Sequence, residues 1–75
     1  MDKHPRIEIN SAVMMGKPVI RGTRITVEII LRRIDDGYTK ADLLEDWPHI
    51  TAEDISAALA FAADHLPRSA PVVAA

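Results

Sequence analysis

The stretch GKPVIRGTRITVEIILRRIDDGY, Gly16–Tyr38, contains the point at which the predicted structure changes from strand to helix. Pro18 opens a short extended piece, a position that proline tolerates in a strand. From Val27 onward the apolar residues recur at i, i+3, i+4 and i+7, which is the pattern of one helix face. Thr26 can cap the start of this helix and Gly37 suits its end. We therefore predict a short strand followed directly by a helix.

One more strand and two more helices are predicted on either side of this stretch. The segment RIEIN, residues 6–10, alternates apolar and polar residues as a half-buried strand does. Thr39 and Thr51 are each followed three residues later by Asp, and this spacing is typical of a capping box at a helix start. Pro48 is expected to stop the second helix, and Pro67 the third.

This order of elements predicts a mainly α fold, with a short N-terminal β-strand pair followed by a three-helix bundle. Only about four residues separate the last two helices, as in a helix-turn-helix. We expect one small domain of this kind over residues 1–66 and a flexible tail over residues 67–75, where prolines and alanines predominate. A chain of 75 residues has a small core, so we also expect a homodimer.

The composition argues against several classes of protein. The chain has no cysteine, and its three histidines lie far apart, so we expect no metal site and no cofactor. No apolar run approaches the ~18 residues of a membrane span, and we expect a cytoplasmic protein without a membrane partner. The serines have no obvious base and there is no glycine-rich phosphate loop, so we expect no enzyme.

The charge is distributed unevenly along the chain. Residues 1–33 contain seven basic and three acidic residues, a net charge of +4, whereas residues 34–75 carry −6. The two halves can attract each other, within one chain or between chains. Equally, the basic half can meet a polyanion while the acidic half faces elsewhere.

The candidate binding residues of the basic half lie before and on the RGTR turn and in the last turns of the helix that follows it: Lys17, Arg21, Gly22, Thr23, Arg24, Arg32 and Arg33. Two guanidinium groups on a rigid turn suit phosphates or carboxylates. The alternative is that the glycine serves only the turn, and that the arginines are solvated, pair with the acidic half or stabilise a helix C-terminus. The neighbouring pair Met14-Met15 is expected to fill the core or an interface.

The third helix is a poor candidate for reading DNA. Recognition helices offer Arg, Lys, Asn or Gln to bases and phosphates. From Thr51 to Leu66 this segment instead carries a net charge of −3, with six alanines that permit close helix packing. We interpret it as scaffold.

Two segments, GKPVIRGTRITVEIIL and DDGYTKADLLEDWPHITAEDISAALAFAA, resemble the bacterial and archaeal family called domain of unknown function 433. The resemblance covers Ile7–Ala63. Family members usually have glycine where Met15 stands, which suggests a less tightly turned loop here, and proline where Thr26 stands.

The resemblance implies a homeodomain-like helix-turn-helix and an antitoxin of VapB type, which binds and silences a PIN-related nuclease toxin and represses its own operon. Arg21, Arg24 and, from the tail, Arg68 are candidates to enter the acidic pocket of such a nuclease. Two alternatives stay open. One is a stand-alone regulator that binds operator DNA through the basic strands of a dimer, and the other is a self-association module with no affinity for nucleic acid.

Overall fold

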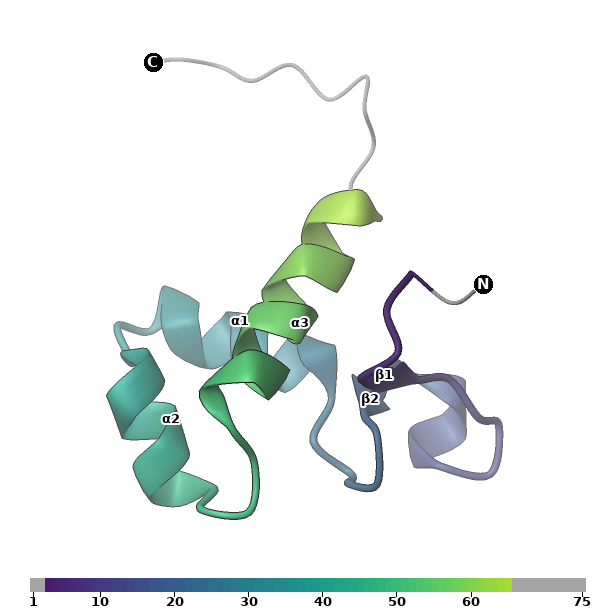
Figure 1. Ribbon diagram of the computed structural model, residues 1–75, viewed down its shortest axis with the longest axis horizontal. Helices are drawn as coiled ribbons and strands as arrows, with labels where there is room; N and C mark the ends of the chain where they lie inside the picture. Colours follow the sequence, from purple (N-terminus) through teal and green to yellow (C-terminus); the bar gives the residue numbers. More distant parts are fainter. Residues whose placement is uncertain (1–2, 66–75) are drawn as a thin grey trace.

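The computed structural model describes residues 3–65, which form a small strand pair and three helices (Figure 1). The elements in chain order are β1 (Ile7–Glu8), the 3-10 turn η1 (Met14–Gly16), β2 (Val19–Ile20), α1 (Val27–Asp35), α2 (Lys40–Asp46) and α3 (Ala52–Asp64). The predicted fold class is confirmed, and α1 and α2 lie between the residues predicted to cap and end them, although both strands are shorter than the sequence pattern suggested. Helix α3 ends at Asp64, before Pro67, which lies with the predicted tail outside the described residues.

The two strands form an antiparallel pair in which Ile7 faces Ile20 and Glu8 faces Val19. After β2 the chain turns back on itself, and Val19 forms a further antiparallel bridge with Thr26. The first residue of α1 is tied to the strand region because the Val27 N–H donates to the Pro18 carbonyl at 2.9 Å. The helical part therefore starts from a fixed point on the strand pair.

The helix ends follow the predicted capping chemistry. The Thr26 side chain accepts from the N–H of Ile29, and Thr39 and Thr51 each form a complete capping box. Gly37, with φ of +99°, ends α1 in a left-handed conformation that glycine adopts without steric cost. The Tyr38 N–H then bonds back to the carbonyl of Arg33, as in a Schellman motif.

The core lies where α1 crosses α3 and where α2 and β1 close its sides (Figure 1). Its buried apolar residues are Ile7, Ile20, Ile25, Val27, Ile30, Leu43, Ile50, Ile55 and Ala58. Trp47 and Leu59 pack against this cluster while remaining partly exposed. Leu66, the last residue of the segment that the sequence analysis interpreted as scaffold, lies outside the described residues.

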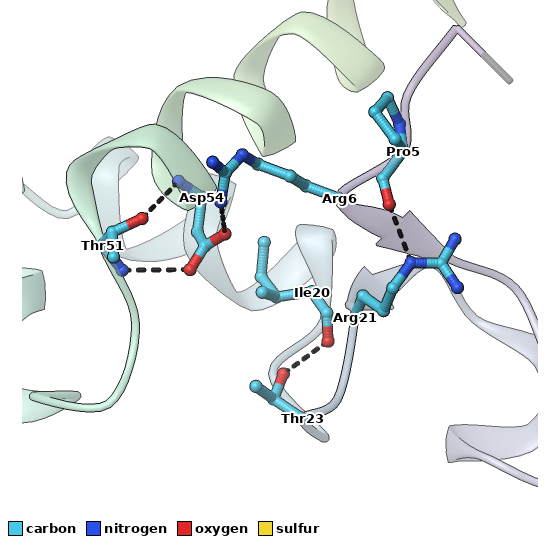
Figure 2. Close-up of polar contacts among 7 residues, drawn as sticks. All are labelled: Pro5, Arg6, Ile20, Arg21, Thr23, Thr51 and Asp54. Carbon is cyan, nitrogen blue, oxygen red and sulfur yellow. Dashed lines mark hydrogen bonds and ion pairs between the residues drawn. The ribbon is translucent and has the colours of Figure 1, made fainter.

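An ion pair joins the strand pair to the third helix. Arg6 Nη1 donates to Asp54 Oδ1 at 3.0 Å (Figure 2). Partial burial opposes ionisation of Asp54, but the Thr51 N–H and the Arg6 guanidinium together hold the pKa of that carboxyl below its usual value. Part of the attraction between the basic and acidic halves is therefore intramolecular.

None of the helices within residues 3–65 is long and apolar enough to cross a membrane. In the same part of the chain, no group of three or more histidine, aspartate or glutamate side chains is arranged to hold a metal ion.

Candidate cationic groove

The RGTR turn is held in one conformation by its own glycine and threonine. Gly22 has φ of +80°, and the Thr23 N–H donates to the Ile20 carbonyl at 2.9 Å, which is the arrangement of a type II turn. The Thr23 hydroxyl donates to the same carbonyl at 2.8 Å (Figure 2). It also accepts from the N–H of Ile25 at 3.0 Å. These two predicted site residues shape the turn.

Arg21 uses its guanidinium to bind the N-terminal segment of its own chain. Its Nε donates to the Pro5 carbonyl at 2.7 Å (Figure 2). Its Nη2 donates to the Ile7 carbonyl at 3.3 Å. Backbone carbonyls in an extended segment need donors, and a planar guanidinium can serve two of them at once. The structure thus assigns Arg21 to the connection between the turn and β1.

Arg33 is engaged in the contact between α1 and α2. Its Nη1 donates to Asp46 Oδ2 at 2.7 Å, and its guanidinium carbon lies 4.6 Å from the ring centre of Trp47 and 5.3 Å from that of Tyr38. An arginine that stacks on an aromatic ring and pairs with a carboxylate is held in a defined position. These contacts agree with the alternative interpretation of Arg33, in which the side chain stabilises the fold.

The other three cations, Lys17, Arg24 and Arg32, line one shallow groove of about 430 Å³. They come from three places in the chain: the segment before β2, the end of the RGTR turn and the last turns of α1. The rest of the lining consists of Met14, Ile25, Thr26, Glu28, Ile29 and Trp47. The groove therefore combines basic side chains with a largely apolar floor.

The electrostatics of the groove leave positive charge available. Lys17 Nζ lies 3.1 Å from Glu28 Oε1, with both side chains more than half exposed, and a pair of this kind is weak and easily exchanged. Within residues 3–65 the side chains of Arg24 and Arg32 form no hydrogen bond or ion pair. With Glu28 as its acidic residue, the groove carries a net charge of +2.

The loop before Gly16 is tightly turned, so the looser loop that the Met15 substitution suggested is wrong. Met14 and Met15 have φ of +47° and +57°, and Gly16 follows at +83°. The Gly16 N–H donates to Val13, and the Lys17 N–H donates to Met14. Two methionines thus adopt the left-handed backbone that usually requires glycine or asparagine. The Met15 side chain is 93% exposed, so it does not fill the core of the chain.

The sequence did not indicate the apolar floor of the groove. Ile29 lies off the i, i+3, i+4, i+7 face that the sequence predicts for α1, and Trp47 follows the last residue of α2; both are only partly buried. The apolar face of α1 extends beyond its central residues, and Ile29 lies at the edge of that face. From this edge Ile29 lines the groove. Arg68, the predicted contact from the tail, lies outside the described residues.

Comparison with known proteins identifies relatives along most of the chain. The model of the family described as protein of unknown function DUF433 matches residues 7–62. The uncharacterized protein y4eO of Sinorhizobium fredii is 36% identical over 50 residues, which are 67% of this chain and 23% of that protein. The crystal structure of a DUF433 member protein from Anabaena variabilis superposes with a TM-score of 0.78 at 35% identity, over 80% of this chain and 59% of the other. The chain therefore spans less than two thirds of either relative.

Proposed function

The chain belongs to the DUF433 family, and we propose that it acts as an antitoxin-like binding protein that neutralises a PIN-related nuclease. The observation that carries the proposal is the groove in which Lys17, Arg24 and Arg32 surround an apolar floor. Nucleases of this kind cluster carboxylates around a divalent metal ion. A guanidinium that enters such a cluster pairs with two carboxylate oxygens and competes with the metal or with the substrate.

Arg24 is the residue best placed for this role. It follows a turn that Gly22 and Thr23 hold rigid, so less conformational freedom is lost when its side chain is captured. Its side chain forms no ion pair or hydrogen bond within the described chain, and its guanidinium is exposed. Arg32 lines the same groove and supplies a second cation of the same kind.

The apolar floor favours a protein partner over a duplex. Contacts to nucleic acid are dominated by phosphates, which use cations and polar groups. A protein interface has an apolar centre with a polar rim. Met14, Ile29 and Trp47 provide such a centre between the basic residues.

The experiment is coexpression with the protein encoded by the adjoining reading frame, with growth and copurification as the two measurements. We expect the wild-type chain to restore growth and to copurify. The double variant Arg24→Glu, Arg32→Glu is expected to lose both. Lys40→Glu, a charge reversal at an exposed lysine outside the groove whose Nζ donates to the Ser56 hydroxyl at 2.7 Å, is the control and is expected to bind as the wild type does. Equal performance of the double variant would refute the role of the groove.

Repression of the operon by direct DNA binding is the second function that we propose to test. The same cations would face phosphates, in a homodimer whose basic N-terminal halves lie together. The α2–turn–α3 order is that of a helix-turn-helix, but α3 carries Glu53, Asp54 and Asp64 on its length, so the strand side is the better candidate. A gel shift that weakens steeply with salt and disappears in the Arg24→Glu, Arg32→Glu variant supports this function.

A self-association module is the remaining alternative. It requires a dimer that dissociates as salt rises and a groove without affinity for protein partner or DNA. Sedimentation of the chain alone at low and high salt distinguishes it from the two binding functions.

A further inference from the structure

Beside the cationic groove, an exposed methionine stands on a rigid loop. We infer that Met15 is an anchor that inserts into an apolar socket on an acidic partner protein, next to the carboxylates that Lys17 and Arg24 meet. This inference rests on the proposed function and names the surface that the partner must offer. It is carried by the exposure of Met15, the fixed geometry of its loop and the charge of the neighbouring groove.

The loop that presents Met15 is pinned by hydrogen bonds on both sides. The Ala12 N–H donates to Asn10 Oδ1 at 2.9 Å, and the Val13 N–H donates to the Asn10 carbonyl at 2.8 Å. After the methionines, the Gly16 N–H donates to the Val13 carbonyl at 3.0 Å. The position of the Met15 backbone is thus fixed before any partner binds, which lowers the ordering cost of an interface.

Nothing within the described chain explains a large apolar residue at this position. Among its exposed large apolar side chains, that of Met15 is the most exposed, at 93%. Its φ of +57° lies in the region that glycine adopts without strain, so the methionine makes the local backbone less favourable. Within residues 3–65 the Met15 side chain therefore adds no packing, and it makes the backbone conformation at this position less favourable.

A methionine suits an anchor because its side chain is apolar, unbranched and adaptable to an irregular socket. Its neighbour Met14, exposed by 38%, lines the cationic groove, so the loop and the groove form one continuous surface. The net positive charge of the groove selects a partner with a complementary acidic surface. A second copy also carries an acidic half, so self-association is one of the outcomes that the test below distinguishes. Duplex DNA offers no apolar socket in its phosphate backbone.

The test compares Met15→Gly with Met15→Leu in the full chain. Glycine removes both the side chain and the backbone strain, whereas leucine keeps an apolar side chain of similar size with the same strain. We expect Met15→Gly to raise the melting temperature by about 2–6 °C. We expect it to weaken binding to the protein encoded by the adjoining reading frame by about tenfold or more. Met15→Leu is expected to keep the wild-type melting temperature and to bind within about threefold of the wild type.

Loss of affinity in a variant that is more stable cannot arise from misfolding, so the two readouts together isolate the anchor. Undiminished binding by Met15→Gly would overturn the inference. If Arg24→Glu, Arg32→Glu still abolishes binding in that case, the proposed function stands and the anchor alone is wrong. If the wild-type chain does not bind, the proposed function fails first. A change in self-association of Met15→Gly, measured by sedimentation, or in its binding to duplex DNA, with partner affinity unchanged, would also overturn the inference.

Discussion

Replacing Arg21 by alanine is expected to destabilise the chain, whereas the same replacement at Arg24, three residues away, is expected to leave stability almost unchanged. Both are exposed arginines of one turn. They differ in what the guanidinium touches: Arg21 donates to the carbonyls of Pro5 and Ile7, and Arg24 donates to no group within residues 3–65. The comparison therefore measures the connection between the turn and the N-terminal segment.

The magnitude follows from the two hydrogen bonds. A hydrogen bond that involves a charged group contributes about 1.5–3 kcal/mol, but exposure to water reduces this value, and the bond to Ile7 is long at 3.3 Å. We therefore expect Arg21→Ala to lower the free energy of unfolding by about 1–2 kcal/mol. For a domain of this size, that loss lowers the melting temperature by about 5–12 °C. A surface change such as Arg24→Ala is expected to stay within about 0.5 kcal/mol.

The assay is thermal and urea unfolding of the full chain, followed by circular dichroism, at one protein concentration. Arg21→Lys is the informative intermediate, because lysine keeps the charge but lacks the planar fork that serves two carbonyls. Its melting temperature is expected to lie between those of the wild type and Arg21→Ala. A loss of stability in Arg24→Ala as large as that in Arg21→Ala would refute the reasoning. An Arg21→Ala variant as stable as the wild type would refute it as well.

Three further predictions concern the fold. Ile30→Ala, at a fully buried position between the helices, is expected to lower the free energy of unfolding by about 2–5 kcal/mol, and Ile30→Val by about 0.5–1.5 kcal/mol, in urea unfolding. Thr26→Ala removes the N-cap of α1 and is expected to cost about 1 kcal/mol in the same assay, with Thr26→Ser close to the wild type. Burial opposes ionisation of Asp54, but Thr51 and Arg6 lower its pKa overall, so its charged form stabilises the fold above its ordinary value of 3.8 and this contribution is lost as pH falls through the lowered pKa. A pH series of melting temperatures is expected to show a shallower acid decline for Asp54→Asn than for the wild type, and parallel curves would contradict this linkage.

The elements and their ends were predictable because they depend on local rules. Periodicity identified α1, and the spacing of Thr39 and Thr51 from their aspartates identified the starts of α2 and α3. The strands were harder, since two residues of pairing on each side leave little alternating pattern. Their lengths depend on which backbone groups meet across the pair, and this is a tertiary property.

The candidate site was only partly predictable. The sequence placed the cations in one half of the chain. It could not show which of their side chains would form contacts within the folded chain. Arg21 is engaged by two backbone carbonyls, and carbonyls leave no signature in the side-chain sequence. Arg33 is engaged by a carboxylate and an aromatic ring that lie 13 and 14 positions further along the chain. Only the three-dimensional arrangement separates these from the cations that line the groove.

The chain's own contacts also bear on what kind of partner can use the groove. The two arginines held by internal contacts fix the surroundings of the groove: Arg21 holds the turn that carries Arg24, and Arg33 holds Trp47, which lines the floor. Reversing the charge of either would disturb the fold as well as the site, so a loss of binding in such a variant would be uninformative. Arg24 and Arg32 can be reversed without breaking a hydrogen bond or an ion pair within residues 3–65. For that reason, the electrostatic contribution of the groove to binding is measured at those two positions.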